Sequence, residues 1–374
     1  MPLTTTTIGA YPKPKQTPIQ DWFLGTKSEE ERKASKGLLS NWSPGAYEKA
    51  LESAGADAEK LFLAAIKEVI TDQVNAGIDV PTDGEVRRES YVLYQCRFLN
   101  GVSFKEVTHK SVRQGAFEAD LPTIVAPISS KEIRMHLDWK SAQQFTKNPV
   151  KITLPGPMTI TDSIANNYYD DMKKLGFDLA LALNKEVKAL VDAGCQYIQI
   201  DEPVFARKPD EAHSYGMENL ERMMHGIPKE VQRVCHICCG YPNSLDSEGY
   251  KKADLDAYDR IASLVDDSTI DEVSLEDSHR HNDLNLLEKF TKTKVIFGFI
   301  DIAKSRMESV EEVRVRIKDS LEHIDEHRLI AAPDCGLGFF TREQAIEKMT
   351  ILTKAAKSIS VSYTHLTLPT TPRV

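Results

Sequence analysis

Eight short apolar runs, separated by longer amphipathic stretches, constrain the fold more than any other feature of this sequence. Each run is rich in Ile, Val, Leu or Thr and ends in or near Gly, Pro, Asp, His or Cys. Such runs are typical of parallel strands that are buried on both faces. They lie at 5–12, 76–85, 149–157, 195–203, 233–241, 271–279, 294–302 and 328–338. Eight strands with intervening helices predict an α/β fold, a (β/α)8 TIM barrel, with a doubly wound open sheet as the alternative.

Helical periodicity fills several of the intervals between these runs. Four helices are predicted, over 57–77, 177–194, 309–324 and 341–359. The first two end on Gly77 and Gly194, and glycine suits the C-terminal end of a helix. Ser309 and Glu312 form a capping-box pattern, and Thr341 is a suitable N-cap, so the starts of the last two helices are also predicted.

The remaining segments suggest one catalytic domain with additions. Residues 86–130 follow the second strand without a clear period, and an insertion of this size favours a functional segment or a small excursion. The polar stretch 13–56 is expected to wrap the outside of the barrel. We expect the barrel to occupy 1–360. The Thr- and Pro-rich stretch 361–374 has no helical period and is interpreted as a flexible or non-native tail.

Composition excludes several classes of function. Asp and Glu number 56 against 47 Lys and Arg, a net charge of −9, and there is no basic run. A nucleic-acid partner is therefore not expected. The sequence has neither a transmembrane run nor a signal-peptide pattern at its start, which favours a cytoplasmic protein without a membrane partner. Six cysteines are ordinary for a reducing compartment, where a Cys/His cluster favours a metal site or catalysis over disulfides.

One such cluster is the stretch CHICC at 235–239. In a strand, residues i and i+2 share a face, so His236 and Cys238 form a chelating pair. Cys235 and Cys239 have the opposite parity and are expected to face the helical layer as small buried residues. One such pair is a weak metal signal by itself, because zinc takes four ligands.

Other strand ends supply the missing ligands. In a barrel, catalytic groups gather at the carboxyl ends of the strands. Glu276 and Cys335 lie at two further strand ends and complete a candidate zinc site with His236 and Cys238. Ligands scattered over about a hundred residues are more typical of a catalytic zinc than of a structural one. The alternative is that these are buried cysteines and ordinary polar strand ends.

Several motifs in one order also carry a family resemblance. They are TTTTIGAYP, DGEVRRESYV, LPGPMTI, YIQIDEPVF, HIC, VSLEDSHRHNDLNLLEKF and PDCGLGFFTRE. Over about residues 3–358 the chain resembles the C-terminal catalytic barrel of cobalamin-independent methionine synthase. The resemblance places zinc on the same four residues, His236, Cys238, Glu276 and Cys335. It implies methyl transfer to the thiol of homocysteine, which gives methionine.

The resemblance also implies an anchor for the amino-acid part of the substrate. Asp201 and Glu85 are the expected catalytic residues and would bind its ammonium group. The backbone around Ile8, Gly9 and Ala10 would bind its carboxylate.

Departures from the family pattern leave the methyl donor open. There is no room for the second, N-terminal barrel of the full-length enzymes. The folate-stacking Trp motif has no match after LPGPMTI, and Ala303 and Lys304 stand where the family has a proton-donating His. An acid is needed when the leaving group is a poor one. A methylated corrinoid protein, a sulfonium compound and a methyl-folate are therefore all candidate donors.

Two other functions remain as alternatives. One is zinc-dependent alkyl transfer or lyase chemistry on another thiol, of the epoxide:coenzyme M type. The other, from a different class, is a non-catalytic zinc-stabilised binding protein.

Overall fold

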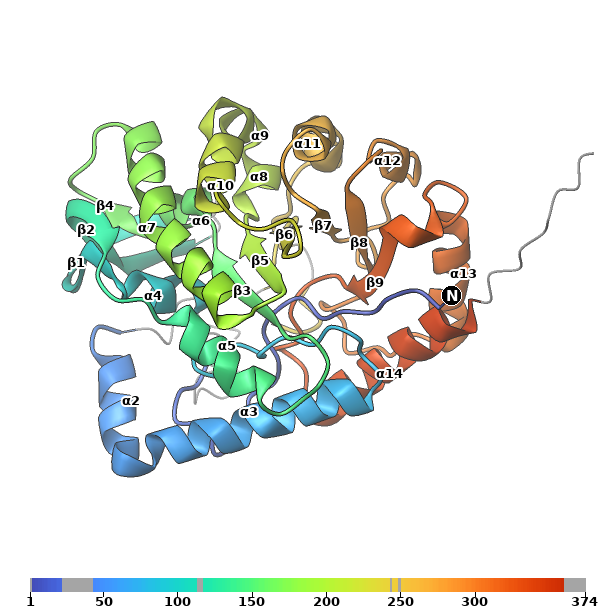
Figure 1. Cartoon of the computed structure of the whole chain (residues 1–374), viewed down its shortest axis with the longest axis horizontal. Coiled ribbons are helices and arrows are strands. Elements are labelled where there is room, and N and C mark those ends of the chain that lie inside the picture. Colours follow the sequence, from blue (N-terminus) through green and yellow to red (C-terminus); the bar gives the residue numbers. More distant parts are fainter. Residues whose placement is uncertain (1, 22–42, 113–116, 243, 248–249, 360–374) are drawn as a thin grey trace, which may run out of the picture.

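Six parallel strands form the wall of the fold. The computed structural model describes residues 2–21, 43–112, 117–242, 244–247 and 250–359. In spatial order the strands are β3 (Lys151–Pro155), β5 (Tyr197–Asp201), β6 (Gln232–Ile237), β7 (Glu272–Leu275), β8 (Lys294–Ile300) and β9 (Leu329–Pro333). All five pairings between neighbours are parallel (Figure 1). Their carboxyl ends therefore lie together at one mouth of the barrel.

Two extended segments close the ring between β9 and β3. Isolated parallel bridges join Thr5 to Ala331, Thr6 to Val80, and Thr82 to Lys151. The predicted strands 5–12 and 76–85 thus occupy barrel positions without becoming regular strands. The reason is local, because side-chain hydroxyls replace part of the ladder: Thr5 Oγ1 donates to Asp79, and Thr6 Oγ1 donates to the Val80 carbonyl. The predicted TIM-barrel-like α/β fold is confirmed.

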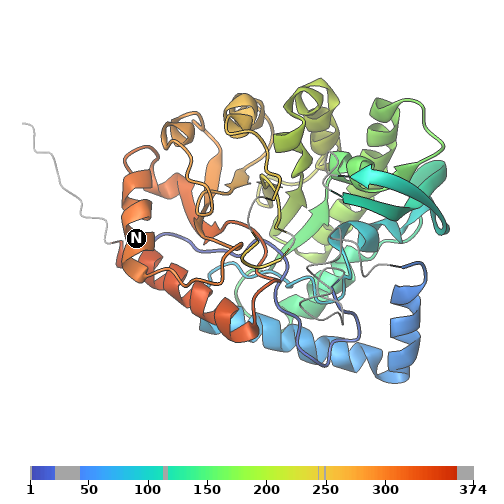
Figure 2. The same cartoon turned by 180° about the vertical axis from the view of Figure 1, so that it is seen from behind.

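Helices surround the strands on the outside (Figure 2). The four predicted ones are α3 (Ala58–Asn75), α7 (Met172–Ala193), α13 (Val310–Ser320) and α14 (Arg342–Ser358). Both predicted N-caps are present, with capping boxes Ser309–Glu312 and Thr341–Gln344. Gly194 ends α7 in the left-handed conformation. The other α-helices among the described residues are α2 (Ala46–Ala54), α4 (Tyr91–Cys96), α5 (Met135–Gln143), α6 (Pro157–Ser163), α8 (Val204–Arg207), α9 (Pro209–Glu211), α10 (Met217–Met223), α11 (Ala257–Asp266) and α12 (Asn285–Glu288).

The insertion at 86–130 is an antiparallel hairpin preceded by a short helix. Strands β1 (Leu99–Val112) and β2 (Phe117–Ser130) pair with each other, and β2 also pairs with the short β4 (Ala165–Asn166). The β1–β2 register shifts twice, between Asn100 and Val102 and between Ser103 and Val107. Each shift breaks the two-residue alternation, which explains why the sequence shows no strand period here.

The flanking segments differ from expectation in one respect. Lys13 and Asp21 form a buried ion pair of 2.9 Å, so the start of the 13–56 stretch reaches the interior and does not only wrap the outside. Within that stretch, residues 22–42 lie outside the described part of the chain, as does the predicted tail at 361–374. None of the described helices is long and apolar enough to cross a membrane.

Candidate functional site

The carboxyl ends of the strands enclose one pocket of about 110 Å³. Its wall contains all of the predicted substrate-binding residues and three of the four predicted metal ligands: Ile8, Gly9, Ala10, Glu85, Asp201, His236, Cys238 and Cys335. The structure therefore brings together residues from both ends of the sequence, as a closed barrel requires.

His236, Cys238 and Cys335 form a compact group. One ligand atom from each, the imidazole nitrogen and the two sulfurs, lies within 4.8 Å of the others. Cys335 Sγ is 3.4 Å from His236 Nε2. His236 belongs to β6, Cys238 follows that strand directly, and Cys335 follows β9 by two residues. This is the arrangement that strand parity and strand ends predicted.

A hydrogen bond orients the imidazole of His236. Its Nδ1 is 2.9 Å from the hydroxyl of Ser274, which lies on the neighbouring strand β7. Nε2 is thereby directed to the side of the two sulfurs. A hydrogen bond with Cys335, aided by His236, holds the pKa of the Cys238 thiol well below its usual range despite burial. One thiolate is therefore favoured in this group.

The predicted fourth ligand, Glu276, lies beside this group without joining it. Its carboxylate is not within 4.8 Å of all three ligand atoms, and its Oε2 accepts a 2.7 Å hydrogen bond from the Cys239 amide. Its Oε1 is buried and has no hydrogen-bond partner among the described residues. Burial, reinforced by the charge of Cys238, raises the pKa of Glu276 well above its usual range.

Asp334 fixes the loop that carries Glu276. Its carboxylate accepts hydrogen bonds of 2.8 Å from the backbone amides of Asp277, Ser278 and His279, and one of 2.7 Å from His279 Nδ1. Burial alone would raise the pKa of Asp334, but these hydrogen bonds lower it. Asp334 also precedes Cys335, so one residue links the ligand on β9 to the loop after β7.

The two other cysteines of CHICC pack in the main core, as parity predicted. Cys235 and Cys239 are both buried with the apolar residues that contact the helices. Burial raises the pKa of Cys239 to about 12 and that of Cys235 well above its usual range. Neither thiol is poised to ionise, which distinguishes them from Cys238.

The acidic neighbours Asp201 and Glu202 have different roles. Asp201 faces the pocket and accepts a 2.7 Å hydrogen bond from Gln199, and burial raises its pKa to about 6. Glu202 points away from the pocket and caps α6, accepting from the amides of Met158 and Thr159 and from the Thr159 hydroxyl. Only Asp201 is available to a ligand.

Glu85 occupies a strained backbone position at the pocket wall. Its φ of 57° is in the left-handed region, which a non-glycine residue rarely adopts. Its carboxylate accepts a 3.0 Å hydrogen bond from Thr153 and lies 3.7 Å from Arg88. Burial raises its pKa to about 7. A Cβ on Gly9 would lie 2.8 Å from this carboxylate, so the turn at Gly9 leaves room for Glu85.

The segment Ile8–Ala10 is held by its own carbonyl groups. Those of Ile8, Gly9 and Ala10 accept hydrogen bonds from the Gln199 amide, the Thr82 hydroxyl and the Leu337 amide. The backbone predicted to bind a carboxylate is thus fixed at the pocket wall.

Sequence reasoning missed several supporting residues. Ser274 and Gln199 each lie two residues before a predicted site residue, so strand parity applied one step further would have found them. The pocket also includes Glu89, Ser90 and Tyr91 from the start of the insertion. These three belong to the motif DGEVRRESYV, but the sequence analysis assigned no role to them.

Comparison with known proteins agrees with this geometry. Residues 45–358 match the family model described as cobalamin-independent synthase, catalytic domain. A methionine synthase from Saccharolobus islandicus is 31% identical over 362 residues, covering 96% of this chain and 95% of the relative. One from Thermococcus kodakarensis is 30% identical, covering 96% and 93%.

A solved structure supports the same family. It is a B12-independent methionine synthase from Shewanella sp. W3-18-1 in complex with selenomethionine, 28% identical, with a TM-score of 0.79. The match covers 95% of this chain and 97% of that one. The chain therefore belongs to the cobalamin-independent methionine synthase family and is an enzyme of the methyltransferase class.

Proposed function

We propose that this methyltransferase moves a methyl group to the thiol of homocysteine and depends on zinc held by His236, Cys238, Cys335 and Glu276. One observation carries the proposal: a compact group of one imidazole and two thiols shares a pocket with two buried carboxylates. The first set suits a thiophilic metal, and the second suits an ammonium group.

The donor set fits zinc. Two sulfurs and one imidazole nitrogen leave one tetrahedral position, which the buried and unpaired Oε1 of Glu276 would fill after a side-chain rotation. Bound zinc would lower the pKa of an incoming thiol, so that the thiol reacts as a thiolate. The protein's own part is to keep His236 oriented through Ser274 and to hold the Glu276 loop through Asp334.

The two carboxylates explain the choice of acceptor. Burial raises the pKa of Asp201 to about 6 and that of Glu85 to about 7, so at neutral pH Asp201 is largely ionised and Glu85 is about half protonated. A substrate ammonium would stabilise both as anions and so be bound by charge-assisted hydrogen bonds. The relative crystallised with selenomethionine carries an amino acid of this kind. An epoxide:coenzyme M type of reaction is less suited, because its sulfonate substrate has no ammonium for these groups to bind.

Two family features that would suit a folate as methyl donor, a stacking Trp and a proton-donating His, are not found among the described residues of this pocket. No tryptophan is among the described residues that line it, and the described Trp139 is buried in the core with its indole donating to the Val150 carbonyl. At the position of the missing His stand Ala303, which offers no acid, and Lys304, which is a weaker acid than a histidinium. These features favour a donor whose leaving group needs no proton, such as a sulfonium, over a methyl-folate. A corrinoid protein finds no support, since the relatives belong to a B12-independent family.

X-ray absorption of the zinc-loaded protein tests the proposal. Homocysteine should add one Zn–S distance, and the deamino analogue 4-mercaptobutanoate should do so only at much higher concentration. If homocysteine leaves the zinc environment unchanged, the thiol-activation role is wrong. A screen of methyl donors with homocysteine fixed then identifies the donor, and exclusive use of a methyl-folate would contradict the sulfonium assignment.

A further inference from the structure

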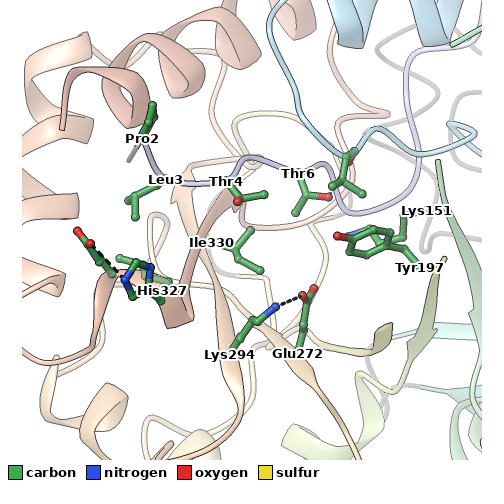
Figure 3. Close-up of a pocket in the computed structure, with 13 residues that line it drawn as sticks. Pro2, Leu3, Thr4, Thr6, Lys151, Tyr197, Glu272, Lys294, His327 and Ile330 are labelled. Carbon is green, nitrogen blue, oxygen red and sulfur yellow. Dashed lines mark hydrogen bonds and ion pairs between the residues drawn. The ribbon is translucent and has the colours of Figure 1, made fainter. Parts of the chain in front are cut away.

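A second pocket lies at the opposite mouth of the barrel, at the amino ends of the strands. It encloses about 160 Å³ and is lined by the first residues of five strands: Lys151, Tyr197, Glu272, Lys294 and Leu329 (Figure 3). A small apolar cluster lies between the two pockets. In this cluster Ile8 lines the upper pocket, and Ile330 lines the lower one. The lower pocket is therefore separate from the site described above.

Lys151 is the feature of this pocket that calls for a ligand. Its side chain is only 1% exposed, and Nζ has no hydrogen-bond partner among the described residues. Burial lowers its pKa to about 8, so it still carries its charge at neutral pH. A buried, unpaired ammonium is costly, and such groups are normally paired.

Two lysines share one carboxylate in this pocket, because the charge of Glu272 acts on Lys151 as well as on Lys294. Lys294 Nζ lies 3.3 Å from Glu272 Oε1, and His327 Nε2 lies 3.5 Å from Glu326 Oε1 (Figure 3). Lys151, Lys294 and Glu272 together carry one positive charge in excess, which suits a monoanion. A dianion such as phosphate would meet the two carboxylates as well. Leu3, Val80 and Ile330 supply apolar side chains to the wall of the same pocket.

We propose that this lower pocket binds a small organic monocarboxylate, whose carboxylate pairs with Lys151 and whose short alkyl chain lies against Leu3, Val80 and Ile330. The pocket is assigned by geometry alone and does not depend on the zinc site or on the reaction. An inhibited or inactive enzyme would still bind this ligand.

Butyrate is the probe for the test, with calorimetry and ligand-observed NMR on the full chain. Wild-type protein should bind one butyrate, and Lys151→Met should weaken binding by about tenfold or more, the effect of losing one charged hydrogen bond. Inorganic phosphate should bind more weakly than butyrate. Cys335→Ala, which changes a residue of the upper pocket, should bind butyrate as the wild type does.

A second pair of variants tests the proposal even if Lys151→Met fails to fold. Thr4 lines the pocket and is exposed, so Thr4→Trp should block entry and abolish binding, whereas Thr4→Ser should retain it. The proposal is overturned if butyrate fails to bind the wild type or if it binds Thr4→Trp unchanged. Stronger binding of phosphate than of butyrate overturns the assignment to an organic monoanion.

Discussion

The two mouths of this barrel both bury ionisable side chains, but they support them differently. At the upper mouth, His236 is held by Ser274, Asp201 by Gln199, and Glu85 by Thr153. At the lower mouth, Lys151 is equally buried and has no partner among the described residues.

The difference lies in how much of each site the protein itself completes. The upper mouth fixes most of its groups with neighbouring side chains before any ligand arrives, which is the preorganisation that catalysis requires, and Oε1 of Glu276 is an exception. At the lower mouth the buried ammonium group of Lys151 has no hydrogen-bond partner among the described residues, so a bound ligand would have to supply one. Four changes test this contrast.

Removing one thiol from the compact group should have the largest effect. Cys335→Ala should lower zinc affinity by well over the ~100-fold that loss of a supporting residue causes, and methyl transfer should fall with it. Cys235→Ala is the matched control, because Cys235 lies in the helical core layer. Zinc content after dialysis and methyl-transfer rate are the measurements. Equal zinc content in the two variants would contradict the ligand assignment.

The two adjacent acids should respond in different ways. Asp201→Asn should lower kcat/KM for homocysteine about 100-fold, equivalent to about 2.7 kcal/mol, because the ammonium loses a charged partner. Glu202→Gln should instead lower the unfolding temperature with little change in KM, because Glu202 caps α6. Steady-state kinetics and thermal unfolding separate the two. A rise in KM for Glu202→Gln alone would reverse the assignment.

The sequence predicts the features of this protein that depend on residues close together in the chain. Strand runs, caps and the parity of His236 and Cys238 are local patterns, so they predicted the barrel, four helices and the shared face of His236 and Cys238. The hairpin in the insertion was missed because two register shifts erase its alternation.

The sequence also did not predict the side chains that become buried only when the barrel closes. Lys151 appears there as an ordinary lysine at a strand start, and its isolation depends on Tyr197, Glu272 and other distant residues around it. The position of Glu276 beside the compact group depends on the hydrogen bonds of Asp334, which no spacing reveals. Its role as fourth ligand stays a prediction.

Loss of the support for His236 should have an intermediate effect. Ser274→Ala leaves every proposed ligand in place but frees the imidazole to rotate, so zinc affinity should fall about tenfold. Ser274→Thr keeps the hydroxyl and should restore most of it. Competition with a chelator measures the affinity. An unchanged affinity in Ser274→Ala would mean that the upper mouth does not depend on this support.

The smallest expected effect is on the free energy of unfolding. Here the substitution should stabilise the protein, whereas the other three changes should each cause a loss. Lys151→Met removes a buried charge that has no hydrogen-bond partner and should stabilise the free protein at pH 7 by about 1 kcal/mol. Because burial lowers the folded-state pKa of Lys151 to about 8, from about 10.5 in the unfolded chain, the unfolded state binds the proton more tightly. Wild-type stability should therefore rise relative to Lys151→Met between pH 8 and pH 10.

Denaturant unfolding at several pH values measures this difference. Lys294→Met is the matched control, because Lys294 is half-exposed and already paired with Glu272, and its removal should not stabilise the protein. Butyrate at pH 7 should raise the stability of the wild type and so narrow the gap to Lys151→Met. A gap that neither pH nor butyrate changes would mean that Lys151 finds its partner within the protein, and the contrast between the two mouths would then disappear.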